Sequence, residues 1–244
     1  MKTTDILFES KFSKKLTKKT AEIISKWSSI HAEKLKNGIN RSTFESVGSK
    51  EEINYYKKAE KFWAIQSTLE DIDKVFIFIE IDRNKIIEFY PNIESQESYF
   101  KYHIENYIIR VNTIMDLVGQ LGNLLYETKI KDKDCNCYIF KEKIKTEHRE
   151  IADILEDILK YVNDRKKRRN KKLHTGILEI DELKSISFWE DFSDVLPESF
   201  DFNNPVLKSM NEEHFKNMID ELRSYLNTLV LKINKFFDNS LNKI

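Results

Sequence analysis

Apolar side chains recur every three or four residues along most of the chain, a spacing that places them on one face of an α-helix. The pattern is clearest between Ser95 and Lys129, where a broad apolar face predicts one long helix. The same periodicity predicts further helices at residues 11–36, from about residue 50 past Leu69, and at 140–163, 181–192 and 210–241. The pattern therefore indicates a protein built from long helices.

Residues 75–90 fit two local structures. Residues 75–81 are rich in strand-forming side chains, and 82–84 could turn the chain back toward 86–90 as a β-hairpin. The alternative is the buried end of a helix followed by a loop, and the helical pattern on either side favours it. Pro91 ends the region in both cases.

Few residues in this chain interrupt helices. It contains only five glycines and three prolines among 244 residues, which argues against a turn-rich β fold and favours an all-α helical bundle. Gly119 and Gly122 fall inside the helix predicted at 95–129, where they weaken the helix locally. We expect them to allow a neighbouring element to approach closely.

Charge is abundant but balanced. Lys and Arg number 41, and Asp and Glu also number 41, so the formal net charge is zero. The chain as a whole therefore does not attract nucleic acid, and any such attraction must be local. We expect one compact unit with an N-terminal helical region at 1–94, a helical core at 95–192 and a C-terminal loop and long helix at 193–244.

Cysteine content and apolar run lengths indicate a cytoplasmic protein. Cys135 and Cys137 lie one residue apart, too close for an unstrained disulfide, so a reducing compartment is expected. Two thiols also fall short of the four ligands of a structural zinc site, and we expect no metal. We find no pattern of a signal peptide and no apolar stretch long enough to span a bilayer.

The residues that suggest chemistry lie between Arg169 and His174, in the order Arg-Asn-Lys-Lys-Leu-His. An arginine can hold the charge of a phosphate, and a histidine can move a proton near neutral pH. These are the two side chains that a metal-free ribonuclease most needs, because RNA supplies its own nucleophile in the ribose 2′-hydroxyl. We expect helix to resume near Arg169 and to continue through His174, with Gly176 as a potential interruption.

This segment resembles the motif of the HEPN superfamily, in which an arginine, often followed by a polar residue such as asparagine, precedes a histidine by a short spacer. The helix at 99–111 also resembles the core helix of HEPN domains, and the resemblance covers about residues 95–192. It implies a helical bundle that usually forms a homodimer and often cuts RNA without a metal or other cofactor. Carried onto this chain, Arg169 and His174 are the expected catalytic pair, and Asn170 orients them.

The resemblance also implies a role as a toxin or antiviral defence effector, with an antitoxin or other regulatory protein as a partner. The motifs of the two subunits are expected to meet in one cleft. Residues five apart on a helix are offset by roughly 140° around its axis, so Arg169 and His174 would not form a tight pair within one helix. Convergence of two facing helices would bring such side chains together, which makes dimerisation a natural requirement.

A dense run of cations at residues 165–172, called here the basic run, precedes and overlaps the motif. Beside a site that cuts RNA, these side chains are expected to bind phosphates, although a helix end near residue 163 would also favour cations there. On the helix at 95–129, Glu105 or Arg110 could support Arg169. The expected phosphate-binding residues are Arg165, Lys166, Lys167, Arg168, Lys171 and Lys172.

Two alternatives to a ribonuclease stay open. A non-catalytic module could use the same basic cleft to bind RNA or a nucleotide, with strong dependence on salt and no cleavage. A protein-interaction module could instead pair its long amphipathic helices at 95–129 and 210–241 with a partner. In that case the basic run would be an ordinary solvated surface.

Overall fold

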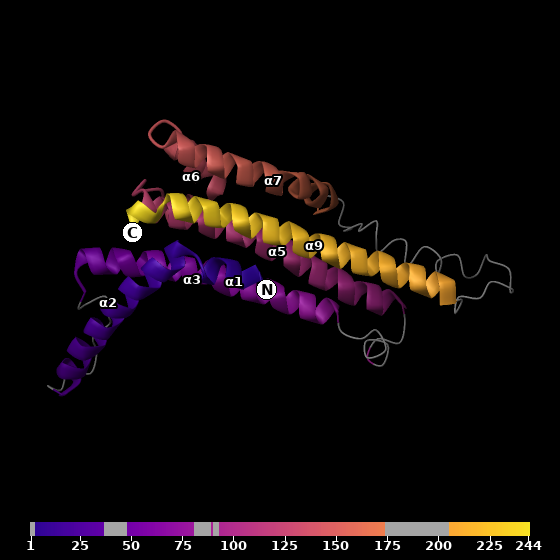
Figure 1. Ribbon diagram of the computed structural model, residues 1–244, viewed down its shortest axis with the longest axis horizontal. Coiled ribbons are helices and arrows are strands. Elements are labelled where there is room, and N and C mark those ends of the chain that lie inside the picture. Colours follow the sequence, from indigo (N-terminus) through magenta and orange to yellow (C-terminus); the bar gives the residue numbers. More distant parts are fainter. Residues whose placement is uncertain (1–2, 37–47, 81–88, 90–92, 174–204) are drawn as a thin grey trace. The chain divides into compact units, whose positions relative to one another are not determined.

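The computed structural model describes residues 3–36, 48–80, 89, 93–173 and 205–244 (Figure 1). Every regular element in those ranges is a helix, which confirms the predicted all-α fold. The α-helices are α1 (Thr3–Phe8), α2 (Lys11–Lys36), α3 (Lys50–Ile79), α5 (Ile93–Leu125), α6 (Cys137–Ile144), α7 (Arg149–Leu173) and α9 (Pro205–Asn239). A short 3-10 helix at Asp132–Asp134 lies between α5 and α6, and another at Leu241–Lys243 follows α9.

The helical alternative for residues 75–79 is confirmed, because α3 continues to Ile79. Residues 81–88 and the helix predicted at 181–192 lie outside the described residues. The single helix predicted at 140–163 is wrong. The amides of Glu147 and His148 both donate to the carbonyl of Ile144, and this turn ends α6 before α7 begins at Arg149. The intervening residues Lys145 to Glu147 are exposed and polar, so no apolar face continues through them.

The chain forms two compact units that do not follow its order. The first, unit 1, comprises Met1–Glu70, Arg110–Lys160 and Val230–Ile244, and the second, unit 2, comprises Asp71–Ile109 and Tyr161–Leu229. Helices α3, α5, α7 and α9 each contribute one part to each unit. Both units therefore depend on contacts between segments that are far apart in the sequence.

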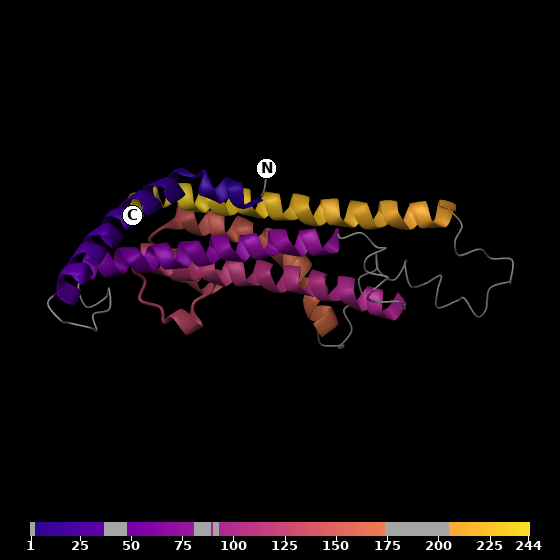
Figure 2. The ribbon, with the colours of Figure 1, turned by 90° about the horizontal axis from the view of Figure 1, so that it is seen from below.

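Buried aromatic rings join the helices of unit 1. The ring centroid of Phe12 on α2 lies 5.4 Å from that of Phe62 on α3 and 4.9 Å from that of Phe237 on α9. All three side chains are fully buried. Helices α3 and α5 lie side by side in this unit (Figure 2), and the Lys61 ammonium donates to the side-chain oxygen of Gln120 at 2.7 Å.

Two glycines of α5 allow the segment around the start of α6 to touch the helix. A Cβ atom added at Gly119 would lie 2.2 Å from the carbonyl carbon of Asn136, and one added at Gly122 would lie 2.2 Å from the Phe140 ring. Both distances are far below van der Waals contact. Asn136 is itself held in place because its side chain accepts the Ile139 amide at 3.0 Å and caps α6. The expected close approach at these glycines is confirmed.

Gly119→Ala is expected to destabilise the protein. Alanine favours a helix over glycine by about 1 kcal/mol, but the added methyl would overlap backbone atoms of Asn136, which cannot rotate away. Overpacking of this kind costs about 1–3 kcal/mol or more, so the free energy of unfolding should fall in urea titrations. Ser67→Ala, at an exposed position of α3, is the control and should leave stability unchanged or slightly raised. Equal stability of Gly119→Ala and the wild type would contradict the packing.

The start of α3 is held by a capping box and an ion pair. The Ser49 hydroxyl accepts the Glu52 amide at 3.2 Å, and the Glu52 carboxylate accepts the Ser49 amide at 2.8 Å. Lys26 on α2 also donates to that carboxylate at 2.6 Å. The hydrogen bond from Lys26 and that from Ser49 lower the pKa of Glu52 from 4.5 to about 2. One carboxylate thus ties α2 to the first turn of α3.

This pKa predicts an acid-dependent loss of stability. Because the pKa of Glu52 is lower in the folded state, its contribution is complete above pH 4.5 and is lost as the pH falls toward about 2. Glu52→Gln should unfold at a lower temperature than the wild type at pH 6, and the difference should shrink as the pH approaches 2. Melting temperatures recorded across this range test it. A difference that is independent of pH would mean that the charge of Glu52 does not stabilise α3.

Candidate functional site

The expected catalytic motif lies at the C-terminal end of α7. Arg169 and Asn170 fall within this helix, which ends at Leu173. Their side chains, and His174 as a whole, lie outside the described residues. The helix is continuous from Arg149, so it neither ends near residue 163 nor resumes near Arg169. The basic run therefore occupies the last turns of a helix whose earlier turns are packed.

The two parts of α7 differ in composition. Between Ile151 and Val162 the helix buries an apolar stripe that also includes Ala152, Leu155 and Ile158. From residue 163 to 172 the sequence contains no apolar residue. Seven of the eight residues from 165 to 172 are Lys or Arg, and a helix of eight residues is about 12 Å long. The last turns of α7 thus concentrate positive charge on a protein whose net charge is zero.

One turn of α9, formed by Leu222, Arg223 and Tyr225 and called here the anchor turn, holds unit 2 together. The Tyr225 ring stacks on that of Tyr161 in α7, with centroids 4.7 Å apart and planes 8° from parallel. The Tyr107 hydroxyl on α5 donates to the Leu222 carbonyl at 3.1 Å. Helices α5 and α7 are therefore both attached to the anchor turn.

The anchor turn also contacts α3. The Arg223 guanidinium pairs with the Glu80 carboxylate at 2.6 Å and lies 5.0 Å from the centroid of the Phe76 ring. The anchor turn thereby links three helices. Tyr161, the first residue of α7 in this unit, lies one helical turn before Arg165. The start of the basic run is consequently set by the partly buried contact between Tyr161 and Tyr225.

The two expected supporting residues both lie half-buried on α5. Glu105 belongs to unit 2, as does Arg169, whereas Arg110 begins the part of α5 that belongs to unit 1. Neither residue has a described contact with the motif, since the Arg169 side chain lies outside the described part of the chain. A supporting role for Glu105 or Arg110 stays a prediction.

The two cysteines are buried and unbridged. Cys135 is 4% exposed and Cys137 is 1% exposed. Burial raises the pKa of the Cys135 thiol to about 11 and that of the Cys137 thiol to about 12. Both thiols are protonated at neutral pH and are therefore poor metal ligands and nucleophiles. Within the described ranges, no three His, Cys, Asp or Glu side chains are grouped closely enough to hold a metal ion.

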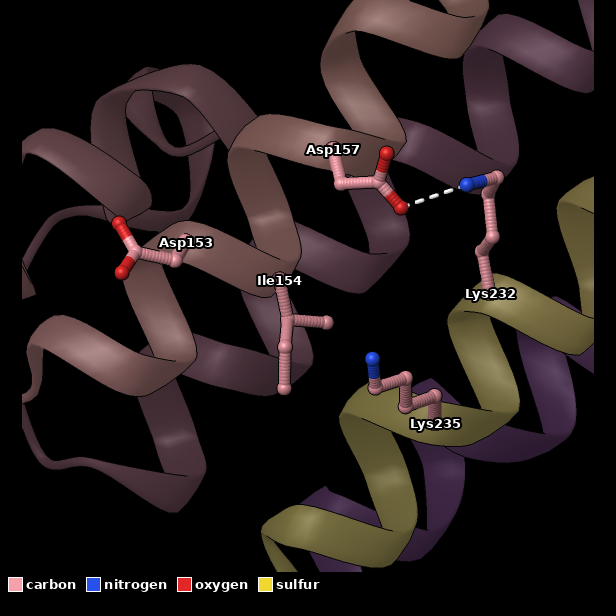
Figure 3. Close-up of a pocket in the computed structure, with 5 residues that line it drawn as sticks. All are labelled: Asp153, Ile154, Asp157, Lys232 and Lys235. Atoms are coloured by element: carbon pink, nitrogen blue, oxygen red, sulfur yellow. Dashed lines mark hydrogen bonds and ion pairs between the residues drawn. The ribbon is translucent and has the colours of Figure 1, made fainter.

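A shallow groove lies between α7 and α9 in unit 1, with a volume of about 210 Å³ (Figure 3). Its lining residues are Asp153, Ile154, Asp157, Lys232 and Lys235. The Lys232 ammonium is already paired with the Asp157 carboxylate at 2.5 Å. The groove thus presents both signs of charge and is smaller than an ordinary small-molecule pocket of about 300 Å³ or more. Its charges do not select an anionic ligand.

A family model for Cthe2314-like HEPN domains matches residues 12–241. The chain belongs to the Cthe2314-like HEPN family. The match extends beyond residues 95–192 on both sides, so the HEPN domain includes helices from α2 to α9. No curated protein and no solved structure matches the chain significantly. None of the helices in the described ranges has the length and apolar character needed to cross a bilayer.

Sequence reasoning missed the tyrosines that build unit 2 of this HEPN domain. In the sequence, Tyr107 is one member of the broad apolar face at 95–129, and nothing identifies the partners of Tyr161 and Tyr225. A tyrosine at a buried position of a predicted helix does indicate a hydrogen bond, because a buried tyrosine hydroxyl usually has a partner. The sequence does not say which partner it finds.

Tyr107→Phe is expected to lower the free energy of unfolding by about 1 kcal/mol, the usual contribution of a buried hydrogen bond. The substitution keeps the ring and removes only the donor to the Leu222 carbonyl. Urea unfolding followed by far-ultraviolet circular dichroism measures the effect. Tyr138→Phe on α6 is the matched control because that side chain is 59% exposed. If both variants are as stable as the wild type, the bond to the anchor turn contributes nothing.

Proposed function

We propose that this HEPN protein is a metal-independent endoribonuclease in which Arg169 and His174 form the catalytic pair. One observation carries the proposal: a chain that belongs to a HEPN family also has an arginine, an asparagine and a histidine at motif spacing. HEPN domains are often ribonucleases. The placement of Arg169 on an anchored helix is compatible with a positioned catalytic group.

The proposed reaction uses the substrate's own nucleophile. The ribose 2′-hydroxyl loses its proton to a base and attacks the adjacent phosphorus, and the bond to the 5′-oxygen breaks as that oxygen gains a proton. The products are a 2′,3′-cyclic phosphate and a 5′-hydroxyl. His174 would transfer a proton in this sequence. Arg169 would stabilise the charge on the phosphate oxygens in the transition state, and Asn170 would orient the pair.

The rest of the basic run would hold the substrate. Arg165, Lys166, Lys167, Arg168, Lys171 and Lys172 surround the proposed catalytic arginine in sequence and share its helix up to Leu173. Each cation that neutralises a phosphate releases counterions, so binding should weaken steeply with salt. Glu105 or Arg110 would keep a supporting role in positioning Arg169.

A homodimer is part of the proposal. Arginine and histidine five residues apart lie roughly 140° apart around a helix, which does not favour a site made by one motif alone. Two copies of the motif facing each other across a two-fold axis would supply both side chains to one cleft. The expected role as a toxin or antiviral effector, restrained by an antitoxin or regulatory protein, belongs to the same proposal.

A non-catalytic RNA-binding module is the second candidate. The seven cations between residues 165 and 172 favour it, because they can bind phosphates wherever the His174 side chain lies. This candidate requires salt-dependent RNA binding and forbids cleavage. A protein-interaction module would show neither.

Cleavage of labelled single-stranded RNA in the presence of a chelator tests the proposal. Wild-type protein should release fragments with cyclic-phosphate ends. His174→Ala should reduce the rate by about 10²–10⁴-fold, the range expected for loss of a general acid–base group. Arg169→Ala should reduce it by about 10²–10³-fold, as expected for loss of a donor that stabilises transition-state charge. Arg149→Ala, at the exposed start of the same helix, is the control and should cleave normally.

Unchanged cleavage by a clean preparation of His174→Ala would show that the histidine is not catalytic. Binding of RNA by the wild type without cleavage would favour the second candidate. Absence of both binding and cleavage would favour the protein-interaction module. Sedimentation analysis of the same preparations would show whether the active species is a dimer.

A further inference from the structure

Four aromatic rings from α3 and α5 meet in unit 2 and form what we call the aromatic cluster: Phe78, Tyr99, Tyr102 and His103. The His103 imidazole stacks on the Phe78 ring, with centroids 5.3 Å apart and planes 21° from parallel. The rings of Tyr99 and Tyr102 form T-shaped contacts with the same imidazole, at centroid distances of 4.5 Å and 5.2 Å. His103 therefore lies at the centre of the aromatic cluster.

The aromatic cluster is held in place and yet remains open to solvent. The Tyr99 hydroxyl donates to the Phe78 carbonyl at 2.9 Å, which joins α5 to the last turn of α3. Phe78 is nevertheless 45% exposed and Tyr102 is 62% exposed. Rings that are already ordered lose little conformational freedom when a ligand stacks on them. The aromatic cluster thus presents ring surface to solvent, and Phe78 and Tyr99 are the rings that the bond between α5 and α3 holds in place.

The basic run and the aromatic cluster each begin one helical turn from a tyrosine that contacts the anchor turn. On α5, His103 lies one helical turn before Tyr107, which bonds to Leu222. On α7, Arg165 lies one turn after Tyr161, which stacks on Tyr225. Figure 1 shows that α5 and α7 run in opposite directions. The basic run and the aromatic cluster therefore lie toward the same end of unit 2.

We propose that the aromatic cluster stacks a base of single-stranded RNA whose phosphates are held by the basic run. The proposal rests on the RNA substrate proposed above and adds a base-binding subsite to it. Proteins that bind single strands commonly combine a positive surface along the backbone with aromatic rings under the bases. The basic run supplies charge complementary to the phosphates, and Tyr102 supplies the most exposed ring of the aromatic cluster. Stacking also tolerates any base, since each has a π-face.

The test measures binding in a His174→Ala background, so that bound RNA is not consumed. The probes are a fluorescent single-stranded RNA of about twelve nucleotides and inorganic polyphosphate, which has the charge but no bases. Tyr102→Ala should weaken RNA binding by on the order of tenfold, as expected for the loss of one stacked base. It should leave polyphosphate binding unchanged. Tyr102→Phe keeps the ring and should bind RNA like the parent protein.

Tyr138→Ala is the matched control, because Tyr138 is 59% exposed on α6 of unit 1. It should change neither affinity. Arg168→Ala should weaken RNA and polyphosphate binding alike, since it removes charge and no ring. Thermal melting of each variant would confirm that the fold is retained, as expected for the exposed side chains of Tyr102 and Tyr138.

Equal RNA affinity of Tyr102→Ala and the parent would overturn the base-binding subsite. Parallel loss of RNA and polyphosphate binding would also overturn it, because the effect would not come from stacking. A loss of dimer in Tyr102→Ala would instead assign the aromatic cluster to an interface between two copies. If wild type cleaves RNA while Tyr102→Ala binds normally, only the subsite fails. If Tyr102→Ala loses RNA affinity selectively while wild type does not cleave, the subsite stands and the nuclease fails.

Discussion

The anchor turn of α9 is the contact on which the candidate site depends. Three groups of one helical turn each engage a different helix of unit 2: the Leu222 backbone carbonyl, the Arg223 guanidinium and the Tyr225 ring. Hydrogen bonds and ring stacking are directional, so they set the rotation and register of the helices that they join more narrowly than apolar contact does. The point where the basic run begins follows from that register.

Helix α7 combines two physical environments without a break. Its first turns are packed, and Lys141 on α6 helps to hold them, because its buried ammonium pairs with Glu142 and Glu156. Asp157 adds an ion pair to Lys232 on α9. Its last turns contain only polar residues before Leu173 and have no apolar face to bury. The packed first half of α7 thus holds a charged second half, an arrangement compatible with the proposed RNA ligand.

A net charge of zero is compatible with RNA as a ligand when the charge is unevenly distributed. Seven cations within eight residues create a strong local field, while acidic residues elsewhere balance the total. The local field would attract phosphates over distances of about one Debye length, roughly 8–10 Å. Specific recognition would then depend on groups that contact the bases, and charge alone does not supply it. The aromatic cluster on α3 and α5 in unit 2 is the group that we propose for that role.

The sequence alone predicted the all-α class, most of the described helices, the basic run and the motif, because helical periodicity and residue spacing are local properties of the chain. It also indicated close approach at Gly119 and Gly122, since glycine destabilises the interior of a helix and is favoured there where a neighbouring element leaves no room for a side chain. It did not predict the break between α6 and α7. Only the tertiary structure decided that α7 starts at Arg149 and that Tyr107 and Tyr161 meet the anchor turn. Tyr107 and Leu222 are 115 positions apart in the sequence, and Tyr161 and Tyr225 are 64 positions apart. Their partners depend on how whole helices pack, which no local pattern records.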